Sequence, residues 1–240
     1  MHPEHAHLLE QIRRGVRPSR HGGFDLAAYS GSPHVFHGLS VPQRRAIARA
    51  WRAQHKAMPA GQLVEVLDSL FDGASHDEKT LATMLLALHK TARLGMGPSD
   101  VDRWLGRLVG WAEVDSLCQN IFTADEMLSD WPAWRGLIER LASDSNINKR
   151  RASLVLLVGP VRYSDDERFA ALALANIERL KVERDILITK AVSWLLRSMV
   201  ERHRARLVAY LEANDPSLPR IAVREARAKL QTGRKGKAKA

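Results

Sequence analysis

The sequence predicts an all-α protein. Apolar residues recur at three- and four-residue spacings along almost the whole chain, and no segment shows the sustained two-residue alternation of a half-buried strand. Residues that favour helix starts precede many of the apolar stretches. These observations predict roughly a dozen helices joined by short loops.

Each predicted helix start carries a residue that satisfies or tolerates the free N–H groups of a first turn. In chain order these residues are Pro42, Pro59, Ser75 with Glu78, Ser99, Asp130 with Pro132, and Ser164 with Glu167. The two Ser–Glu pairs have the spacing of capping boxes. The first pair predicts a helix that runs to Leu94 and stops at Gly95, and Gly73 ends the helix before it.

The predicted helices group into pairs, and the first members of successive pairs begin near residues 59, 99, 130, 164 and 204. This rough period in the thirties is typical of helical solenoids such as the HEAT type. Stacked helix pairs curve and leave an extended concave face, which suits a long partner. We therefore predict one HEAT-like domain over residues 1–231 with a concave basic groove. Residues 232–240 are glycine- and lysine-rich, and we expect them to form a disordered basic tail.

The charge balance indicates an anionic partner, such as nucleic acid or a membrane surface. The 240 residues contain 37 Lys and Arg against 27 Asp and Glu, which gives a formal net charge of +10. A single cysteine, Cys118, excludes an intramolecular disulfide framework and fits a reducing compartment. No apolar stretch is long enough to span a membrane, and the N-terminus does not have the pattern of a signal peptide. We expect a cytoplasmic protein that does not interact with membranes.

Familiar signatures of phosphate-binding loops, dinucleotide-binding folds, zinc proteases and serine hydrolases are absent. Histidines gather in two places, at His2, His5 and His7 and at His34 and His37. No acidic residues accompany them in a ligand pattern, so we expect neither a metal nor a cofactor. Cys118 stands among apolar residues and is expected to be a small core residue rather than a nucleophile.

Trp111 and Asp115 are four residues apart and therefore share one face of a predicted helix. Burying a carboxylate without a partner is costly, so an aspartate beside an indole is an unusual core pair. As a site, the pair could stabilise a developing cation against an aromatic wall. As ordinary structure, Trp111 would lie inside and Asp115 would serve as a cap.

Lys149, Arg150 and Arg151 stand at the start of another predicted helix, where the helix dipole disfavours positive charge. A phosphate group held at that helix start would relieve the conflict and use the free backbone donors. The alternative is a basic turn exposed to solvent.

Lys190, Trp194 and Arg197 follow the i, i+4, i+7 spacing and form one stripe along a helix. Two cations around an aromatic suit a nucleic-acid backbone, because the cations meet phosphates and the ring meets sugar or base. In the alternative interpretation, Trp194 packs between repeats and the two cations reach to water.

Taken in order, these three segments resemble the AlkD-like family of bacterial DNA alkylation repair glycosylases, which are built from HEAT-like repeats. The resemblance rests on Trp111-x-x-x-Asp115, on SNINKRRASLVLL with Arg151, and on KAVSWLLRS with Trp194 and Arg197. Tyr29 and the FHGLSVP segment after it add a weaker match. The resemblance spans roughly residues 20–230.

The resemblance implies that cationic N3- and N7-alkylated purines are excised from double-stranded DNA without base flipping. It implies that Asp115 is the catalytic carboxylate and that Trp111 and Trp194 contact the deoxyribose of the lesion. Arg151 would hold the neighbouring phosphate, helped by Arg197 and Tyr29. The segments themselves add Lys149, Arg150 and Lys190 as DNA-binding candidates.

Two other functions are compatible with the sequence. One is a helical-repeat protein that binds bent or branched DNA without catalysis, and the other is a protein-binding scaffold. We expect the glycosylase to act as a monomer.

Overall fold

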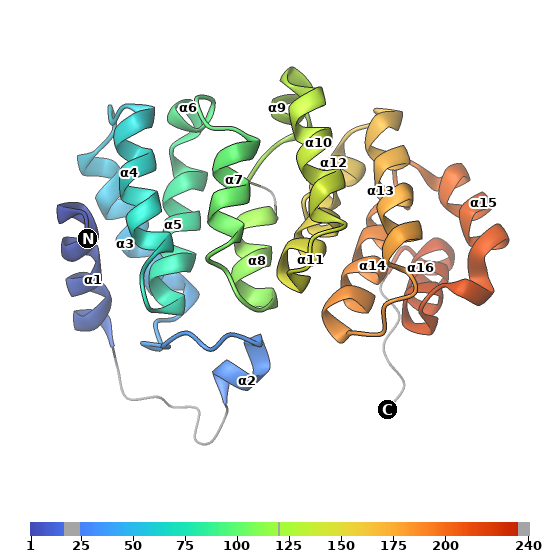
Figure 1. Ribbon diagram of the computed structural model, residues 1–240, viewed down its shortest axis with the longest axis horizontal. Helices are drawn as coiled ribbons and strands as arrows, with labels where there is room; N and C mark the ends of the chain where they lie inside the picture. The colour runs from blue at the N-terminus through green and yellow to red at the C-terminus, as the bar shows by residue number, and fades with distance from the viewer. Residues whose placement is uncertain (17–24, 120, 235–240) are drawn as a thin grey trace. The chain divides into compact units, whose positions relative to one another are not determined.

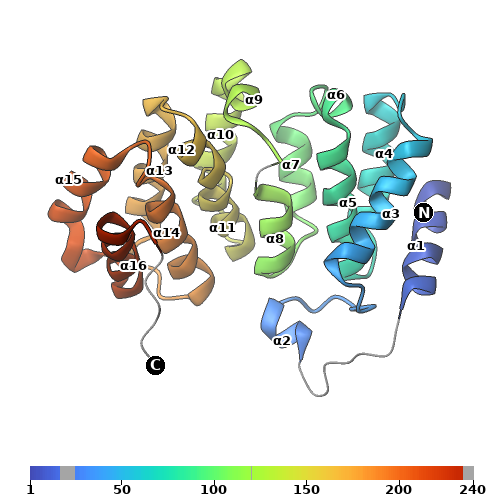
Figure 2. The same cartoon turned by 180° about the vertical axis from the view of Figure 1, so that it is seen from behind.

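The structure is a computed structural model that describes residues 1–16, 25–119 and 121–234 (Figures 1 and 2). Most of these residues lie in α-helices, and β-structure among them is limited to an isolated bridge between Val35 and Ser75. The prediction of an all-α fold is therefore confirmed. No helix in the described part of the chain is long and apolar enough to cross a membrane.

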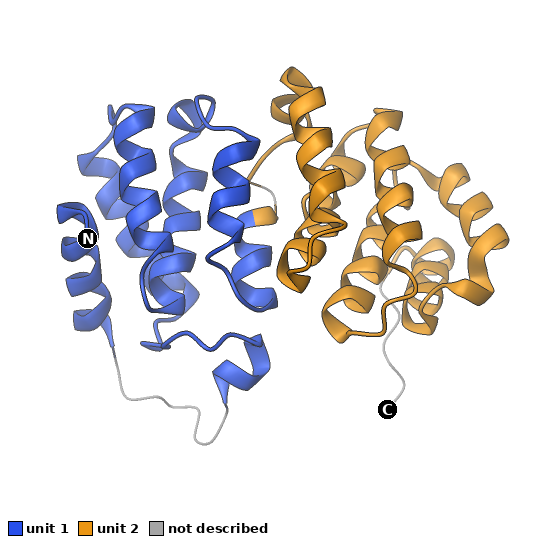
Figure 3. Cartoon of the chain, in the orientation of Figure 1, with its two compact units in different colours: residues 1–117 blue, residues 118–240 orange. Residues whose placement is uncertain are grey.

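The chain forms two compact units, Met1–Leu117 and Cys118–Ala240 (Figure 3). The single domain that the sequence predicts over residues 1–231 stays a prediction.

Sixteen α-helices and one 3-10 helix lie within the described residues. The helices that begin in the first unit are α1 (Pro3–Gly15), α2 (Leu26–Ser30), α3 (Val41–Gln54), α4 (Ala60–Phe71), α5 (His76–Leu88), α6 (Lys90–Arg93), α7 (Pro98–Leu105) and α8 (Trp111–Cys118). The second unit holds α9 (Ala124–Ser129), α10 (Trp131–Leu141), α11 (Ile147–Val155), α12 (Val158–Tyr163), α13 (Glu167–Leu180), α14 (Ile186–Ser198), α15 (Arg204–Asn214), η1 (Asp215–Ser217) and α16 (Arg220–Thr232).

The predicted repeat spacing is confirmed. Helices α4, α7, α10, α13 and α15 begin within about three residues of the predicted first members of the pairs. In the first unit α5 packs against both α3 and α4, and in the second unit α14 packs against α11 and α16. A helical-repeat fold follows from this arrangement.

Local capping signals predicted several helix starts correctly. Ser75 and Glu78 form the expected capping box at the start of α5, and Asp130 caps α10. The prediction of a capping box formed by Ser164 and Glu167 is wrong. Asp166 caps α13, and the Ser164 hydroxyl accepts from the Asp166 N–H instead. An aspartate next to the first helical residue competes successfully with a serine two residues earlier.

The predicted helix that follows the Ser75–Glu78 capping box and runs to Leu94 is divided in the structure. Helix α5 ends at Leu88, and α6 begins at Lys90. His89 between them has a non-helical backbone, and its ring nitrogen Nδ1 hydrogen-bonds the Leu85 carbonyl at 2.9 Å. The Leu85 carbonyl also accepts the His89 N–H at 3.1 Å, so the His89 ring adds a second contact at the end of α5, which apolar spacing does not reveal.

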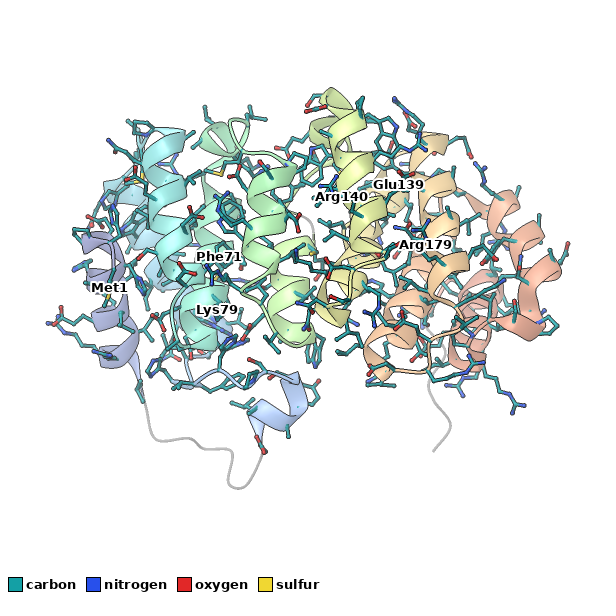
Figure 4. All side chains as sticks on the ribbon, in the orientation of Figure 1. Met1, Phe71, Lys79, Glu139, Arg140 and Arg179 are labelled. Carbon is teal, nitrogen blue, oxygen red and sulfur yellow. The ribbon has the colours of Figure 1, made fainter. Side chains whose placement is uncertain are left out.

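The core of the first unit contains Lys79, a buried lysine on α5. Its ammonium donates to the Phe71 carbonyl at the end of α4 at 2.6 Å, and Figure 4 labels both residues. Burial lowers the pKa of Lys79, although the nearby carboxylates of Glu113, Glu78 and Asp72 act to raise it. The contact joins α5 to α4 and satisfies a carbonyl that the helix itself leaves unpaired.

At the C-terminal end, α16 continues to Thr232, one residue beyond the predicted domain limit, and Gly233 ends it in the left-handed conformation. Residues 235–240 of the predicted disordered tail lie outside the described residues.

Candidate functional site

Helix α8 carries Trp111 and Asp115 on one face, as their spacing predicts. Trp111 is half-buried, and Asp115 is 9% exposed. This differs from the ordinary structural alternative, in which Trp111 would lie inside and Asp115 would serve as a cap, because Asp115 lies within α8 and Trp111 is only half-buried. The pair places a largely desolvated carboxylate beside an indole that is partly accessible.

Three of the six tryptophans, Trp51, Trp104 and Trp134, belong to the core. The other three, Trp111, Trp131 and Trp194, are half-buried. Trp111 and Trp194, the two tryptophans of the sequence-predicted site, are therefore both among the half-buried ones.

Tyr29 packs directly against Trp111 within the first unit. The two rings meet edge to face with their centroids 5.3 Å apart, and the indole N–H of Trp111 donates to the Tyr29 carbonyl at 2.7 Å. Tyr29 is the last but one residue of α2, which lies beside α8 in Figures 1 and 2, and its side chain is 59% exposed. The structure thus brings together two residues that are 82 positions apart and that the sequence selected separately.

Glu113 is a residue that sequence reasoning missed. Its side chain is fully buried, and its carboxylate accepts from the Ser32 hydroxyl at 2.7 Å and from the Val109 N–H at 3.0 Å. Nδ1 of His34 lies 3.0 Å from both carboxylate oxygens, and Nδ1 of His76 lies 3.3 Å from one of them. The spacing of Asp115 from Trp111 marked Asp115 as a candidate site residue. No such local pattern distinguishes Glu113 from other polar residues on a helix.

Glu113 should make the unfolding free energy depend on acid pH. Burial raises the pKa of its carboxyl, but the hydrogen bonds from His76, Val109, Ser32 and His34 outweigh burial and lower it to about 2. Since the folded pKa lies below the unfolded value, the stabilisation is present above about pH 4.5 and is lost as pH falls towards 2. We expect Glu113→Gln to remove a contribution on the order of 2 kcal/mol from that acid-side decline. Urea unfolding of both proteins at several pH values between 2 and 6 measures this, and parallel curves would contradict it.

The basic segment of the second unit lies at the start of α11, which Asn146 caps. The guanidinium of Arg150 meets the Glu183 carboxylate at 2.8 and 3.1 Å and also donates to the carbonyls of Asp144 and Ser145. The Lys149 ammonium lies 3.8 Å from the Asp144 carboxylate. Acceptors of the chain itself therefore relieve much of the charge conflict that had suggested a phosphate, and the basic turn is not simply solvated.

Arg151 is 5% exposed and donates to the Leu187 carbonyl in the first turn of α14. It links α11 to α14 through a charged hydrogen bond, so it has a structural role that the sequence did not indicate. Its proposed contact with a DNA phosphate stays a prediction.

The stripe Lys190, Trp194 and Arg197 lies on α14, whose opposite side buries Ile188, Val192 and Leu195. Lys190 is exposed and Trp194 is half-buried. The Arg197 guanidinium lies 3.2 Å from the Glu225 carboxylate on α16, and the Ser193 hydroxyl donates to the same oxygen at 2.6 Å. Burial lowers the pKa of Arg197 and Glu225 opposes this, while the side chain remains cationic.

The histidine clusters have structural partners. The His5 ring lies 2.7 Å from the Glu78 carboxylate and 2.9 Å from the Ser69 hydroxyl, which secures α1 against α4 and α5. His34 binds Glu113 as described above. Within residues 1–16, 25–119 and 121–234, no group of three or more His, Cys, Asp or Glu side chains has the arrangement of a metal site. Cys118 is buried at the end of α8, as predicted for a core residue.

Comparison with known proteins identifies the family. No curated protein matches the chain. Among solved structures, a "Predicted DNA alkylation repair enzyme from Enterococcus faecalis" is similar in fold, with a TM-score of 0.70, 18% sequence identity, and coverage of 86% of this chain and 93% of that one. The sequence profile of a family described as "DNA alkylation repair enzyme" matches residues 23–230. The chain therefore belongs to the DNA alkylation repair enzyme family.

Proposed function

We propose that the protein is a monofunctional DNA glycosylase that hydrolyses the N-glycosidic bond of cationic N3- and N7-alkylated purines in double-stranded DNA. The observation that carries the proposal is the pairing of Trp111 with Asp115 on α8, in a chain that belongs to a DNA alkylation repair family. In this proposal the enzyme acts as a monomer in the cytoplasm, holds DNA in a basic groove and does not flip the lesion.

The chemistry needs few groups. An alkylated purine carries a positive charge, so it takes the electrons of the C1′–N bond and leaves as a neutral base without a general acid. The sugar becomes oxocarbenium-like, and water adds to C1′ and releases a proton to solvent to give an abasic site. Asp115 stabilises the sugar cation and orients the water. Because Asp115 is only 9% exposed, little water screens the attraction between its negative charge and the sugar cation.

The remaining residues hold the DNA. Trp111 and Trp194 contact the deoxyribose with their accessible ring surfaces, and Tyr29 extends the surface of Trp111. Arg151 and Arg197 hold phosphates near the lesion. Lys149, Arg150 and Lys190 add contacts along the backbone, with Lys190 the most accessible and Arg150 the most engaged by partners of its own chain.

The test is formation of abasic sites in methylated duplex DNA, detected by strand cleavage in alkali. We expect cleavage at positions of methylated purines in the presence of the protein and none in unmethylated duplex. Protein that retards the DNA in a gel without producing abasic sites would instead be a non-catalytic DNA-binding protein. Protein that neither binds DNA nor produces abasic sites would be consistent with a protein-binding scaffold.

Lys190 should contribute one phosphate contact. We expect Lys190→Gln to weaken binding to any duplex sequence and to reduce the slope of log affinity against log salt concentration by about 1. Lys56→Gln, which removes another exposed lysine outside the stripe, is the matched control and should leave the slope nearly unchanged. Fluorescence anisotropy with labelled DNA from 50 to 200 mM salt measures both slopes, and equal slopes for the two variants would refute the assignment of Lys190.

A further inference from the structure

We propose that Glu113 is a positioning residue that fixes Tyr29 and Trp111 as one aromatic wall and thereby sets the face of α8 on which Asp115 lies. This inference rests on the proposed function for its effect on excision, but not for its effect on the structure. It assigns a role to a buried charged network that the chemistry of the reaction does not itself use.

Helix geometry separates Glu113 from the candidate site. Each residue turns an α-helix by about 100°, so Glu113 is turned by about 200° from both Trp111 and Asp115. The two site residues share one face, and Glu113 holds the opposite face. It can therefore restrain the orientation of the helix without touching DNA.

The contacts of Glu113 reach the segment that follows α2. The Ser32 hydroxyl and the His34 ring bind its carboxylate from that segment, and the His76 ring binds it from the start of α5. The Val109 N–H binds the second carboxylate oxygen from the turn just before α8. One buried charge thus joins three parts of the chain at the base of α8.

Further contacts hold the chain on both sides of the segment that contains Ser32 and His34. Just before that segment, the Tyr29 carbonyl accepts the indole N–H of Trp111. After it, the Val35 N–H donates to the Ala74 carbonyl at 3.2 Å, and the His37 N–H donates to the Asp77 carboxylate at 2.7 Å. The segment from Tyr29 to His37 is consequently held near both ends, and Glu113 is the charged group that binds it in between.

The cost of the network argues for a positional role. A fully buried carboxylate is expensive unless several donors satisfy it, and a packed apolar residue often stabilises as well. A site that depends on orientation gains from fixed side chains, since small displacements of reacting groups slow a reaction strongly. The burial of Glu113 therefore fits a requirement for precise placement of the α8 face.

The test replaces Glu113 by Gln. An amide keeps the shape but removes the negative charge and replaces one accepting oxygen by an NH2 group, which cannot accept the hydrogen bonds that end on that oxygen. We expect the indole N–H resonance of Trp111, assigned by its loss in Trp111→Phe, to shift and its hydrogen exchange to become roughly tenfold faster. Single-turnover excision should fall roughly tenfold, while the Kd for duplex DNA changes by less than about twofold.

Glu78→Gln is the matched control. Glu78 is also a buried carboxylate bound to a histidine and a serine in the first unit, but these partners lie on α1 and at the start of α5 and not on α8. It should lower stability without changing the Trp111 resonance or the excision rate. Ser32→Ala, which removes one donor and leaves the carboxylate in place, should show smaller changes in the same direction and serves if Glu113→Gln does not fold.

The two proposals fail in different ways. An unchanged Trp111 resonance and exchange rate in folded Glu113→Gln, or an equal change in Glu78→Gln, would overturn the role of Glu113. A shifted resonance with an undiminished excision rate would overturn its role in the site. A wild-type protein that does not excise bases would refute the proposed function, and the resonance would then still decide whether Glu113 positions Trp111.

Discussion

Asp115→Asn should slow single-turnover excision of 7-methylguanine from duplex DNA by roughly 10²–10³-fold, with little change in DNA binding. The amide keeps the shape of the side chain but removes the negative charge that would stabilise the sugar cation. Because Asp115 is only 9% exposed, water cannot readily replace that charge. The measurement is the rate of abasic-site formation with enzyme in excess over a methylated duplex.

Asp72→Asn provides the control for Asp115→Asn. Asp72 is an exposed carboxylate of the same unit. Its oxygen lies 2.9 Å from Nε of Arg107, which is also exposed, and such exposed ion pairs contribute little to stability. Its excision rate should equal that of the wild type. An Asp115→Asn protein that excises as fast as the wild type would remove Asp115 from the mechanism.

Gly110→Ala should lower the free energy of unfolding by about 2–4 kcal/mol, combining left-handed backbone strain with overpacking. Gly110 has φ +82, and a Cβ there would lie 2.3 Å from the Ser30 carbonyl oxygen and 2.7 Å from Gly31. The turn before α8 thus approaches the backbone at the end of α2 more closely than a side chain allows. Urea unfolding measures the loss as a lower midpoint.

Gly38→Ala separates the two causes of that loss. Gly38 has nearly the same backbone conformation, with φ +84, but nothing lies within 4 Å of the position of its Cβ. It should lose only the conformational part, about 1 kcal/mol. If both alanine variants lose the same free energy, then the close approach of the turn to α2 does not constrain this part of the fold.

Local chemistry explains why much of the fold could be predicted. Capping at Ser75 and Asp130 depends on side chains within three residues, so the sequence displays it directly. The i, i+4 relation of Trp111 and Asp115 needs only a helix. Where two capping residues compete, as Ser164 and Asp166 do, or where a side chain such as His89 ends a helix, apolar spacing alone misplaces the boundary.

Contacts between distant residues explain what the sequence could not predict. Glu113 meets Ser32 across 81 residues and His76 across 37, and Arg150 meets Glu183 across 33. No local spacing encodes such pairs, because they exist only once the helices have packed. The sequence consequently selected Trp111 and Asp115 but not the buried carboxylate behind them, and it left the acceptors of Arg150 and Arg151 unassigned.

The central claim is that a cationic leaving base makes hydrolysis possible with a carboxylate and no general acid. Mass spectrometry of the free bases released from duplex DNA tests it most directly, with one DNA carrying methylated purines and another carrying the uncharged lesions hypoxanthine and O6-methylguanine. We expect release of 3-methyladenine and 7-methylguanine, with abasic sites left in the DNA strand, and no release of the uncharged bases. Release of the uncharged bases at a comparable rate, or no release from the methylated duplex, would contradict it.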